Sequence, residues 1–197
     1  MEHKKATSFN STQQPQEFVI DEYDDHCVMV ALLSRELEHV DIPADINGKP
    51  VTTIGDGCFF DCKCIKTVLI PNSIKEIGVQ AFAMCKDLIE IELPDSITNI
   101  GKCAFRDCTG LKRIVMSANL KTLETGTFSF CYLSDDVEIT LKEGLETIES
   151  RIFNSGGLSH FFTLRLPKSV KVIADGAFTP GINVITDLPY DEKWFEL

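Results

Sequence analysis

The stretch IEIELPDSITNIGKCAFRDC, which runs from Ile89 to Cys108, decides the fold of this chain. It begins as a short β-strand, because Ile91 and Leu93 alternate with glutamates and would point to one face. Pro94 has no N–H group to donate to a neighbouring strand and would end the ladder there. Gly101 would then permit a sharp turn. A pattern that changes so often fits neither a long strand nor a long helix, and it predicts one complete turn of a solenoid.

Related segments recur along the chain, and six copies can be aligned at a spacing of 23–25 residues after a longer first copy. Two columns of apolar residues run through all six copies. The first column is Phe59, Phe82, Phe105, Phe128, Phe153 and Phe178, and the second is Ile54, Ile77, Ile100, Leu123, Ile148 and Ile173. A single coil could not bury its own apolar side, whereas coils stacked ~4.8 Å apart would form a continuous core and a parallel sheet.

The segments IPNSIKEIGVQAFAMC and LPDSITNIGKCAFRDC, together with IPADINGKPVTTIGDGCFFDC, resemble the leucine-rich repeat superfamily and are most similar to its BspA-like branch. The resemblance covers residues 37–181. It implies an α/β solenoid, a right-handed coil of about six repeats of 23–25 residues with one parallel β-sheet on its concave face. Proteins of this branch are often surface antigens, so the resemblance also implies a surface adhesin or a host-interaction protein.

The two ends of the chain differ in composition from the repeats. Residues 1–17 are rich in Ser, Thr, Gln and Lys and predict a disordered tail. Residues 18–36 predict two strands that cap the first coil. Residues 182–197 carry the one tryptophan, Trp194, beside Phe195 and predict a C-terminal cap. The alternative for these aromatics is an exposed anchor for a partner or for a second copy of the chain.

The composition restricts the classes of partner. A formal net charge of −11 should repel phosphate backbones and anionic membranes, so we expect no nucleic-acid partner. No apolar run approaches the ~20 residues that span a bilayer, so we expect no membrane insertion. The sequence has no recognisable signal peptide or anchor, which favours a cytoplasmic location. The alternative, suggested by the family resemblance, is the cell surface or secretion. We expect a monomer.

Eight cysteines raise the question of metal or disulfide chemistry. Four of them recur at the repeat spacing beside the phenylalanines and predict a buried ladder that packs as small apolar side chains. This structural ladder consists of Cys62, Cys85, Cys108 and Cys131 with Phe59, Phe82, Phe105 and Phe128. Disulfides are one alternative, although stacked side chains do not naturally present the required dihedral. Zinc is another, but Cys58, Cys62 and Cys64 lack the spacing of a zinc finger. We predict no metal and no cofactor.

Catalytic motifs are not evident in the sequence, which contains no nucleophile elbow, zinc-protease motif, phosphate loop or dinucleotide fingerprint. We therefore do not expect an enzyme, although a catalytic triad could still assemble in space because geometry defines it. Cys103 lies outside the ladder, beside the inward-pointing Ala104, and we expect its thiol to be partly exposed and reactive.

The outward residues of the repeat strands are the default binding surface of a solenoid. The centre of this surface is acidic, with glutamates that flank one arginine and lie close enough to repel each other. The candidate binding residues are Glu90, Glu92, Arg113, Glu138, Thr140 and Arg165. We therefore predict a non-catalytic protein–protein interaction module that binds through the concave sheet face. The alternatives are a solvated face without a site, an intracellular interaction protein or effector, and, as a third class, an enzyme.

Overall fold

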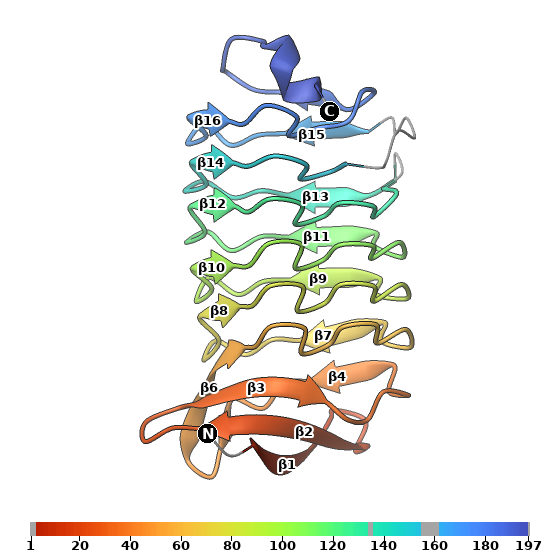
Figure 1. Cartoon of the computed structure of the whole chain (residues 1–197), viewed down its shortest axis with the longest axis vertical. Helices are drawn as coiled ribbons and strands as arrows, with labels where there is room; N and C mark the ends of the chain where they lie inside the picture. Colours follow the sequence, from red (N-terminus) through yellow and green to blue (C-terminus); the bar gives the residue numbers. More distant parts are fainter. Residues whose placement is uncertain (1–2, 134–135, 155–161, 197) are drawn as a thin grey trace.

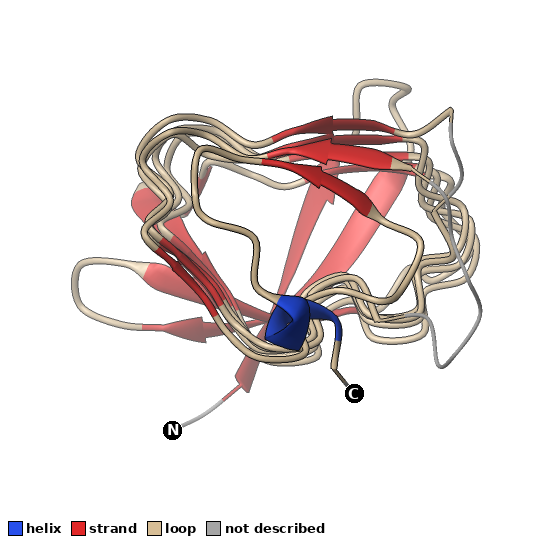
Figure 2. Ribbon diagram, turned by 90° about the horizontal axis from the view of Figure 1, so that it is seen from above, coloured by secondary structure: helices blue, strands red, loops and turns tan. Residues whose placement is uncertain are grey.

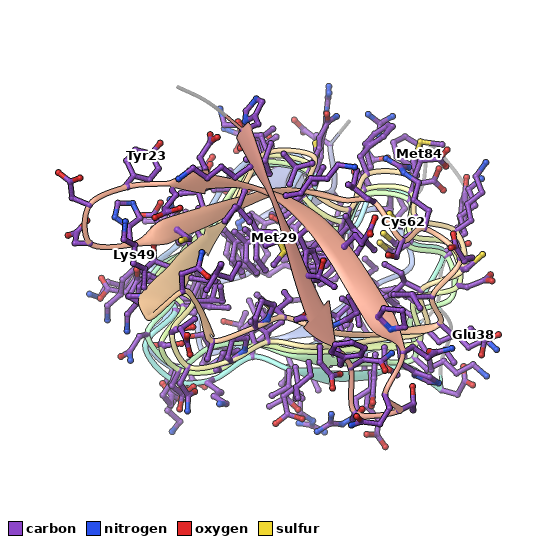
Figure 3. All side chains as sticks on the ribbon, turned by 90° about the horizontal axis from the view of Figure 1, so that it is seen from below. Tyr23, Met29, Glu38, Lys49, Cys62 and Met84 are labelled. Carbon is purple, nitrogen blue, oxygen red and sulfur yellow. The ribbon has the colours of Figure 1, made fainter. Side chains whose placement is uncertain are left out.

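The computed structural model describes residues 3–133, 136–154 and 162–196. The chain winds into a stack of coils along the long axis of the molecule, with an N-terminal group of strands at one end and the C-terminal segment at the other (Figure 1). Viewed along this axis, successive coils superimpose closely (Figure 2). Side chains fill the space that the coils enclose (Figure 3).

One ladder of parallel strands uses the segment that precedes the proline corner of each repeat. Its strands are β4 (His39–Asp41), β7 (Thr67–Leu69), β9 (Glu90–Glu92), β11 (Arg113–Val115), β13 (Glu138–Thr140), β15 (Thr163–Arg165) and β17 (Asn183–Ile185). They pair in register as β4 with β7, as β9 with β11 and β13, and as β15 with β17. This ladder corresponds to the one parallel sheet that the sequence predicts.

A second parallel ladder runs along another side of the coils (Figure 1), where the sequence analysis predicted no sheet. Its strands are β6 (Lys49–Ile54), β8 (Glu76–Ile77), β10 (Asn99–Ile100), β12 (Thr122–Leu123), β14 (Thr147–Ile148) and β16 (Val172–Ile173). The aliphatic column supplies the last residue of each strand, and from Ile54 to Ile148 these residues are buried. Each coil therefore contributes two short strands, and the fold is a β-solenoid.

The α component of the predicted α/β class is wrong. Within the described parts of the chain the structure has no α-helix, and its one helical element is the 3-10 helix η1 (Glu192–Phe195). The Ala-Phe segments, where a short helix was one possibility, fold as successive turns. The reason is a pair of left-handed residues in these segments, because a residue with positive φ interrupts an α-helix.

The left-handed residues occupy two repeated positions, two residues before and two residues after the phenylalanine. The first position holds Gly57, Gln80, Cys103, Gly126, Arg151 and Gly176, and the second holds Asp61, Met84, Asp107 and Phe130. Most of these residues are not glycine, so the sequence gives no local signal for the conformation. The contacts between coils must offset its cost, which is about 1–3 kcal/mol for each non-glycine residue.

Phenylalanine rings stack through the middle of the core. The ring centroids of Phe59 and Phe82 are 4.7 Å apart, and the following three pairs, as far as Phe153, are separated by 5.2, 5.4 and 5.6 Å. The rings are almost parallel, with interplanar angles of 3° to 10°. Such contacts stabilise a core beyond the burial of apolar area. The stack agrees with the register in which the first five of the six phenylalanines were aligned.

Gly101 does not serve the sharp turn that the sequence suggested, since it is not among the residues with positive φ. Its role is a close approach between coils. A Cβ atom at Gly101 would lie 2.5 Å from the backbone nitrogen of Val79, and one at Gly78 would lie 2.6 Å from the backbone nitrogen of Asp56. Only a residue without a side chain allows the backbones to come so near.

The N-terminal segment differs most from the sequence expectation. Residues 1–17, expected to be a disordered tail, include β1 (His3–Phe9) and the start of β2 (Pro15–Glu22). These two strands pair antiparallel, and β2 pairs in turn with β3 (Cys27–Leu32). Because β3 also pairs with β6, the hairpin continues the second ladder. A short strand, β5 (Asp45–Ile46), pairs with the start of β6.

Two buried amides explain why this polar segment is ordered. The side chain of Gln16 donates from Nε2 to the carbonyl of Asp41 (2.9 Å) and accepts from the N–H of the same residue through Oε1 (2.9 Å). The side chain of Asn10 donates to the carbonyl of His39 (2.8 Å) and accepts from the N–H of Gln14 (2.8 Å). Both side chains thus find backbone partners in place of water, which makes their burial possible.

The C-terminal segment covers the last coil. Trp194, in η1, is buried, and its carbonyl accepts a hydrogen bond from the N–H of Phe178 (2.9 Å). The ring of Phe195 lies 5.9 Å from the ring of Phe178. Tyr190 remains exposed beside them. These contacts place apolar side chains over the open end of the core.

Candidate functional site

The candidate site lies on the strand face, which we define as the outward side of the ladder formed by β4, β7, β9, β11, β13, β15 and β17. Side chains alternate along a strand, so the middle residue of each strand is directed inwards and its neighbours outwards. In β9, Ile91 is buried whereas Glu90 and Glu92 are exposed. The short strands therefore hold two columns of outward side chains in fixed register.

Four of the six predicted binding residues meet at the centre of the strand face. Arg113 lies in register between Glu90 and Glu138 on the neighbouring strands. Its Nη1 atom donates to Oε2 of Glu92 (2.8 Å) and lies 3.8 Å from Oε2 of Glu90. The hydrogen bond to Glu92 raises the pKa of the Arg113 guanidinium above its ordinary value. The arginine thus offsets the repulsion between glutamates that the sequence suggested.

The other two predicted residues lie farther along the same face. Thr140 is exposed on β13 and is in register with Val115, which is buried although its position is an outward one. Arg165 is exposed on β15, and it is in register with Ile185 on β17. In the described part of the chain, β15 pairs with β17 and not with β13. Arg165 is therefore not joined by strand pairing to the acidic centre on β9, β11 and β13.

An exposed leucine beside the acidic centre was not among the predicted binding residues. Leu69, in β7, has 64% of its surface exposed. A shallow hollow of about 270 Å³ lies next to it, lined by Val68, Leu69, Ile70, Glu90, Glu92 and Pro94. The signal was available, because Leu69 is an apolar residue at an outward strand position, where the neighbouring strands β4 and β9 place Asp41 and Glu92. The strand face thus combines an apolar surface with carboxylates.

The cysteines of the predicted ladder are buried and have a structural role. The thiols of Cys85, Cys108 and Cys131 donate to the carbonyls of Phe59, Phe82 and Phe105, respectively. The distance from sulfur to oxygen is 3.1 Å in each of the three hydrogen bonds. Burial raises the pKa of Cys85 to about 12, and it raises that of Cys131 to about 12. Cysteines that stay protonated are poor nucleophiles and poor metal ligands.

The last coil replaces the thiol of this ladder by a hydroxyl group. Thr179 is fully buried, and its Oγ1 atom donates to the carbonyl of Phe153 (3.2 Å). The sequence alignment did not identify Thr179, because it follows its phenylalanine, Phe178, directly whereas the cysteines follow theirs by three residues. The hydrogen bond to the preceding coil is therefore preserved although the residue and its position change.

Cys103 lies outside the ladder, as predicted, and is partly buried. Its Sγ atom is 3.8 Å from the carbonyl of Thr125. A hollow of about 430 Å³ next to this thiol is also lined by Arg106, Phe130 and Arg151. The guanidinium of Arg106 lies 5.1 Å above the ring of Phe130. The reactivity of the Cys103 thiol stays a prediction. Cys64 is the other cysteine that is accessible to solvent.

The His, Cys, Asp and Glu side chains of the described residues form no group of three or more that could hold a metal ion. The described histidines make hydrogen bonds to Asp21, Asp25 and Thr67. No helix in the described ranges is long and apolar enough to cross a membrane.

Comparisons with known proteins agree with this architecture. A family model described as the BspA type leucine-rich repeat region matches residues 31–155 and 135–186, with six copies. The solved structure of a leucine-rich repeat protein of T. pallidum is 24% identical, with a TM-score of 0.66 over 93% of this chain and 80% of that chain. A search of curated proteins found no match.

Two further solved structures are longer than this chain. A leucine-rich cell surface protein from Faecalibacterium prausnitzii is 22% identical, with a TM-score of 0.61 over 92% of this chain and 55% of that chain. A leucine-rich repeat protein from Eubacterium ventriosum is 25% identical, with a TM-score of 0.60 over 87% of this chain and 51% of that chain. The chain thus spans about half the length of these two proteins.

Proposed function

Because the chain belongs to the BspA-type leucine-rich repeat family, as its sequence predicted, we propose that it is a non-catalytic protein-binding module and that its strand face receives the partner. Solenoids of stacked repeats present long, regular surfaces that bind other proteins. A fold alone does not define a function, so the proposal depends on what this surface carries.

The observation that carries the proposal is the exposed Leu69 beside Glu90 and Glu92. An exposed apolar side chain next to a hollow can act as an anchor for a partner. The surrounding carboxylates would favour a partner that places basic residues around an apolar one, and they would speed its association. Arg113 holds Glu92 in place through the 2.8 Å hydrogen bond, so part of the acidic surface is ordered before binding.

The location of this partner separates two versions of the proposal. The similarity to a protein named as a leucine-rich cell surface protein supports an adhesin or a host-interaction protein outside the cell. The eight free thiols support the alternative, an intracellular interaction protein or effector, because thiols persist in reducing compartments. We favour the surface role.

The test is a pull-down from extracellular matrix and from host-cell lysate, performed with three forms of the chain as bait. These are the wild type, Glu90→Lys with Glu92→Lys, and a control, Glu76→Lys with Asp175→Lys. The control makes the same change in net charge at exposed positions outside the strand face. A partner retained by the wild type and the control but lost by the first variant would support the proposal. Equal capture by all three would exclude the acidic centre as the site.

A further inference from the structure

The first strand of the chain lies at the edge of the largest sheet. The strands of this sheet follow the order β1, β2, β3, β6, β8 and β10, so β1 has a neighbour on one side only. β1 spans seven residues, from His3 to Phe9, without a proline. A long edge strand of this kind is a template for pairing with another chain.

The hydrogen bonds of the hairpin show which backbone groups of β1 are free. Asn10, which follows β1, donates its N–H to the carbonyl of Gln14 (3.0 Å). Hydrogen-bonded pairs alternate with non-hydrogen-bonded pairs along an antiparallel ladder, so the backbone N–H and C=O groups of the even-numbered residues of β1 point to β2. Phe9 lies opposite Pro15, which has no N–H group, in agreement with this assignment. The outward N–H and C=O groups are therefore those of His3, Lys5, Thr7 and Phe9. Within the described residues these groups have no hydrogen-bonding partner.

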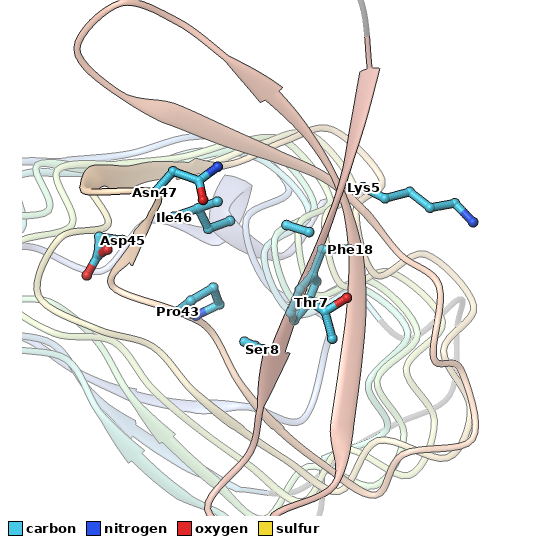
Figure 4. Close-up of a pocket in the computed structure, with 9 residues that line it drawn as sticks. Lys5, Thr7, Ser8, Phe18, Pro43, Asp45, Ile46 and Asn47 are labelled. Carbon is cyan, nitrogen blue, oxygen red and sulfur yellow. The ribbon is translucent and has the colours of Figure 1, made fainter.

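A hollow of about 300 Å³ runs along this free edge (Figure 4). It is lined by Lys5, Ala6, Thr7 and Ser8 of β1, and by Phe18, Pro43, Asp45, Ile46 and Asn47. Consecutive residues of a strand point to opposite faces. A hollow that contacts four consecutive residues of β1 reaches the edge of the strand, and the contact with Phe18 of β2 shows that it also extends beneath the hairpin. The space lies where an added strand would place its inward side chains.

The charge around β1 differs from that of the whole chain. β1 begins with His3, Lys4 and Lys5, in a protein with a net charge of −11. His3 is hydrogen-bonded to Asp21 (2.6 Å) and Lys4 to Glu22 (2.8 Å). Lys5 is exposed and has no acidic partner in the described part of the chain. The edge of β1 therefore offers a basic side chain that a partner can neutralise.

We propose that β1 is a docking edge for an extended, acidic segment of a partner protein, which adds to the sheet as a further strand. The backbone of this segment would pair with the outward groups of His3, Lys5, Thr7 and Phe9. Every second side chain would be apolar and enter the hollow beside Ala6, while the alternate side chains would be acidic and lie near Lys5. Backbone pairing supplies affinity in this mode of recognition, and the alternate side chains supply specificity.

A second copy of the chain is a poorer occupant for this edge. Pairing β1 with β1 of another copy would place two Lys5 side chains without acidic partners on neighbouring strands, and like charges on neighbouring strands destabilise a sheet. The acidic partner segment meets the opposite charge. It also leaves the strand face of the protein unoccupied, so the two surfaces can bind independently.

The proposal can be tested by fluorescence anisotropy with a labelled peptide of about eight residues in which valine and glutamate alternate. A peptide of alternating valine and lysine is the charge control. The protein variants are Thr7→Pro, which removes an outward N–H group from an edge where proline is tolerated, its control Thr7→Ala, and Lys5→Glu. Circular dichroism melting checks that each variant folds, and sedimentation measures the oligomeric state.

We expect the wild type and Thr7→Ala to bind the glutamate peptide and not the lysine peptide. Thr7→Pro should weaken binding at least ten-fold, and Lys5→Glu should weaken it about ten-fold through the lost charge attraction. The Glu90→Lys, Glu92→Lys variant should bind the peptide as the wild type does, which separates this edge from the strand face. If Thr7→Pro unfolds the hairpin, Lys5→Glu decides the question.

The proposal is overturned if the wild type does not bind the glutamate peptide, if it binds both peptides equally, or if folded Thr7→Pro and Lys5→Glu bind as tightly as the wild type. A dimer of the wild-type protein that Thr7→Pro converts to a monomer would assign the edge to a second copy of the chain and would also overturn it.

Discussion

Replacing Phe105 by alanine would remove the middle ring of the phenylalanine stack. This side chain is fully buried, and its ring centroid lies 5.2 Å from that of Phe82 and 5.4 Å from that of Phe128. Phe→Ala changes in packed cores cost about 3–5 kcal/mol. We expect the upper part of this range, about 4–5 kcal/mol, because two stacked neighbours lose their contacts and both are held by backbone hydrogen bonds between coils.

The assay is thermal unfolding followed by circular dichroism. For a chain of this length, 1 kcal/mol corresponds to a change in Tm of roughly 2–4 °C, so the Tm should fall by about 8–20 °C. Phe60→Ala is the control, since Phe60 follows Phe59 of the stack in the chain but is itself 40% exposed and lies outside the stack. A Tm for Phe105→Ala within the error of the wild type would refute the role of the stack, whereas a similar fall in both variants would show a general effect of losing an aromatic residue.

Three further predictions concern the glycine contacts and the thiols. Gly101→Ala should lower the free energy of unfolding by about 1–3 kcal/mol, because its Cβ atom would force neighbouring coils apart; a wild-type urea midpoint would contradict this. In the native protein, Cys64 and Cys103 should react with a thiol reagent at neutral pH and the buried cysteines should not; fast reaction of all eight would contradict their burial. Burial raises the pKa of Cys85 and Cys131 to about 12, above the ordinary value of 9.0, so the unfolded state loses these protons first and stability should fall as the pH rises from about 9 towards 12. Urea unfolding of the wild type and of Cys85→Ala with Cys131→Ala at several alkaline pH values measures this slope, which should be smaller in the variant.

The repeated core was predictable from the sequence because its residues recur at fixed spacing. Phe105 and Ile100 recur with their counterparts in every copy, and the alternation around Ile91 assigned Glu90 and Glu92 to the outward side. Such patterns are set by the requirement that one side of each coil be apolar. The burial of these residues therefore depends little on details of the backbone conformation.

Features set by backbone geometry were not predictable. The left-handed residues include Met84 and Phe130, which have no intrinsic preference for positive φ, so the conformation arises from stacking between coils. The ordered N-terminus depends on Gln16, whose partner Asp41 is 25 residues away. Composition alone could not reveal a bond of this range. The hydrogen bond between Arg113 and Glu92 likewise depends on a rotamer that a sequence does not specify.

The repeated contact from one coil to the next has a consequence for how such a chain can change in length. The backbone of Gly101 meets the coil of Gly78, which in turn meets the preceding coil in the same way. Removal of residues 88–110 would place Phe128 against Phe82 with every column still aligned. A deletion of half a turn would instead break the alignment of the columns. Genes that encode this fold are therefore free to gain or lose whole turns, and the distance between the two ends of the protein can evolve in steps of one coil without a new core.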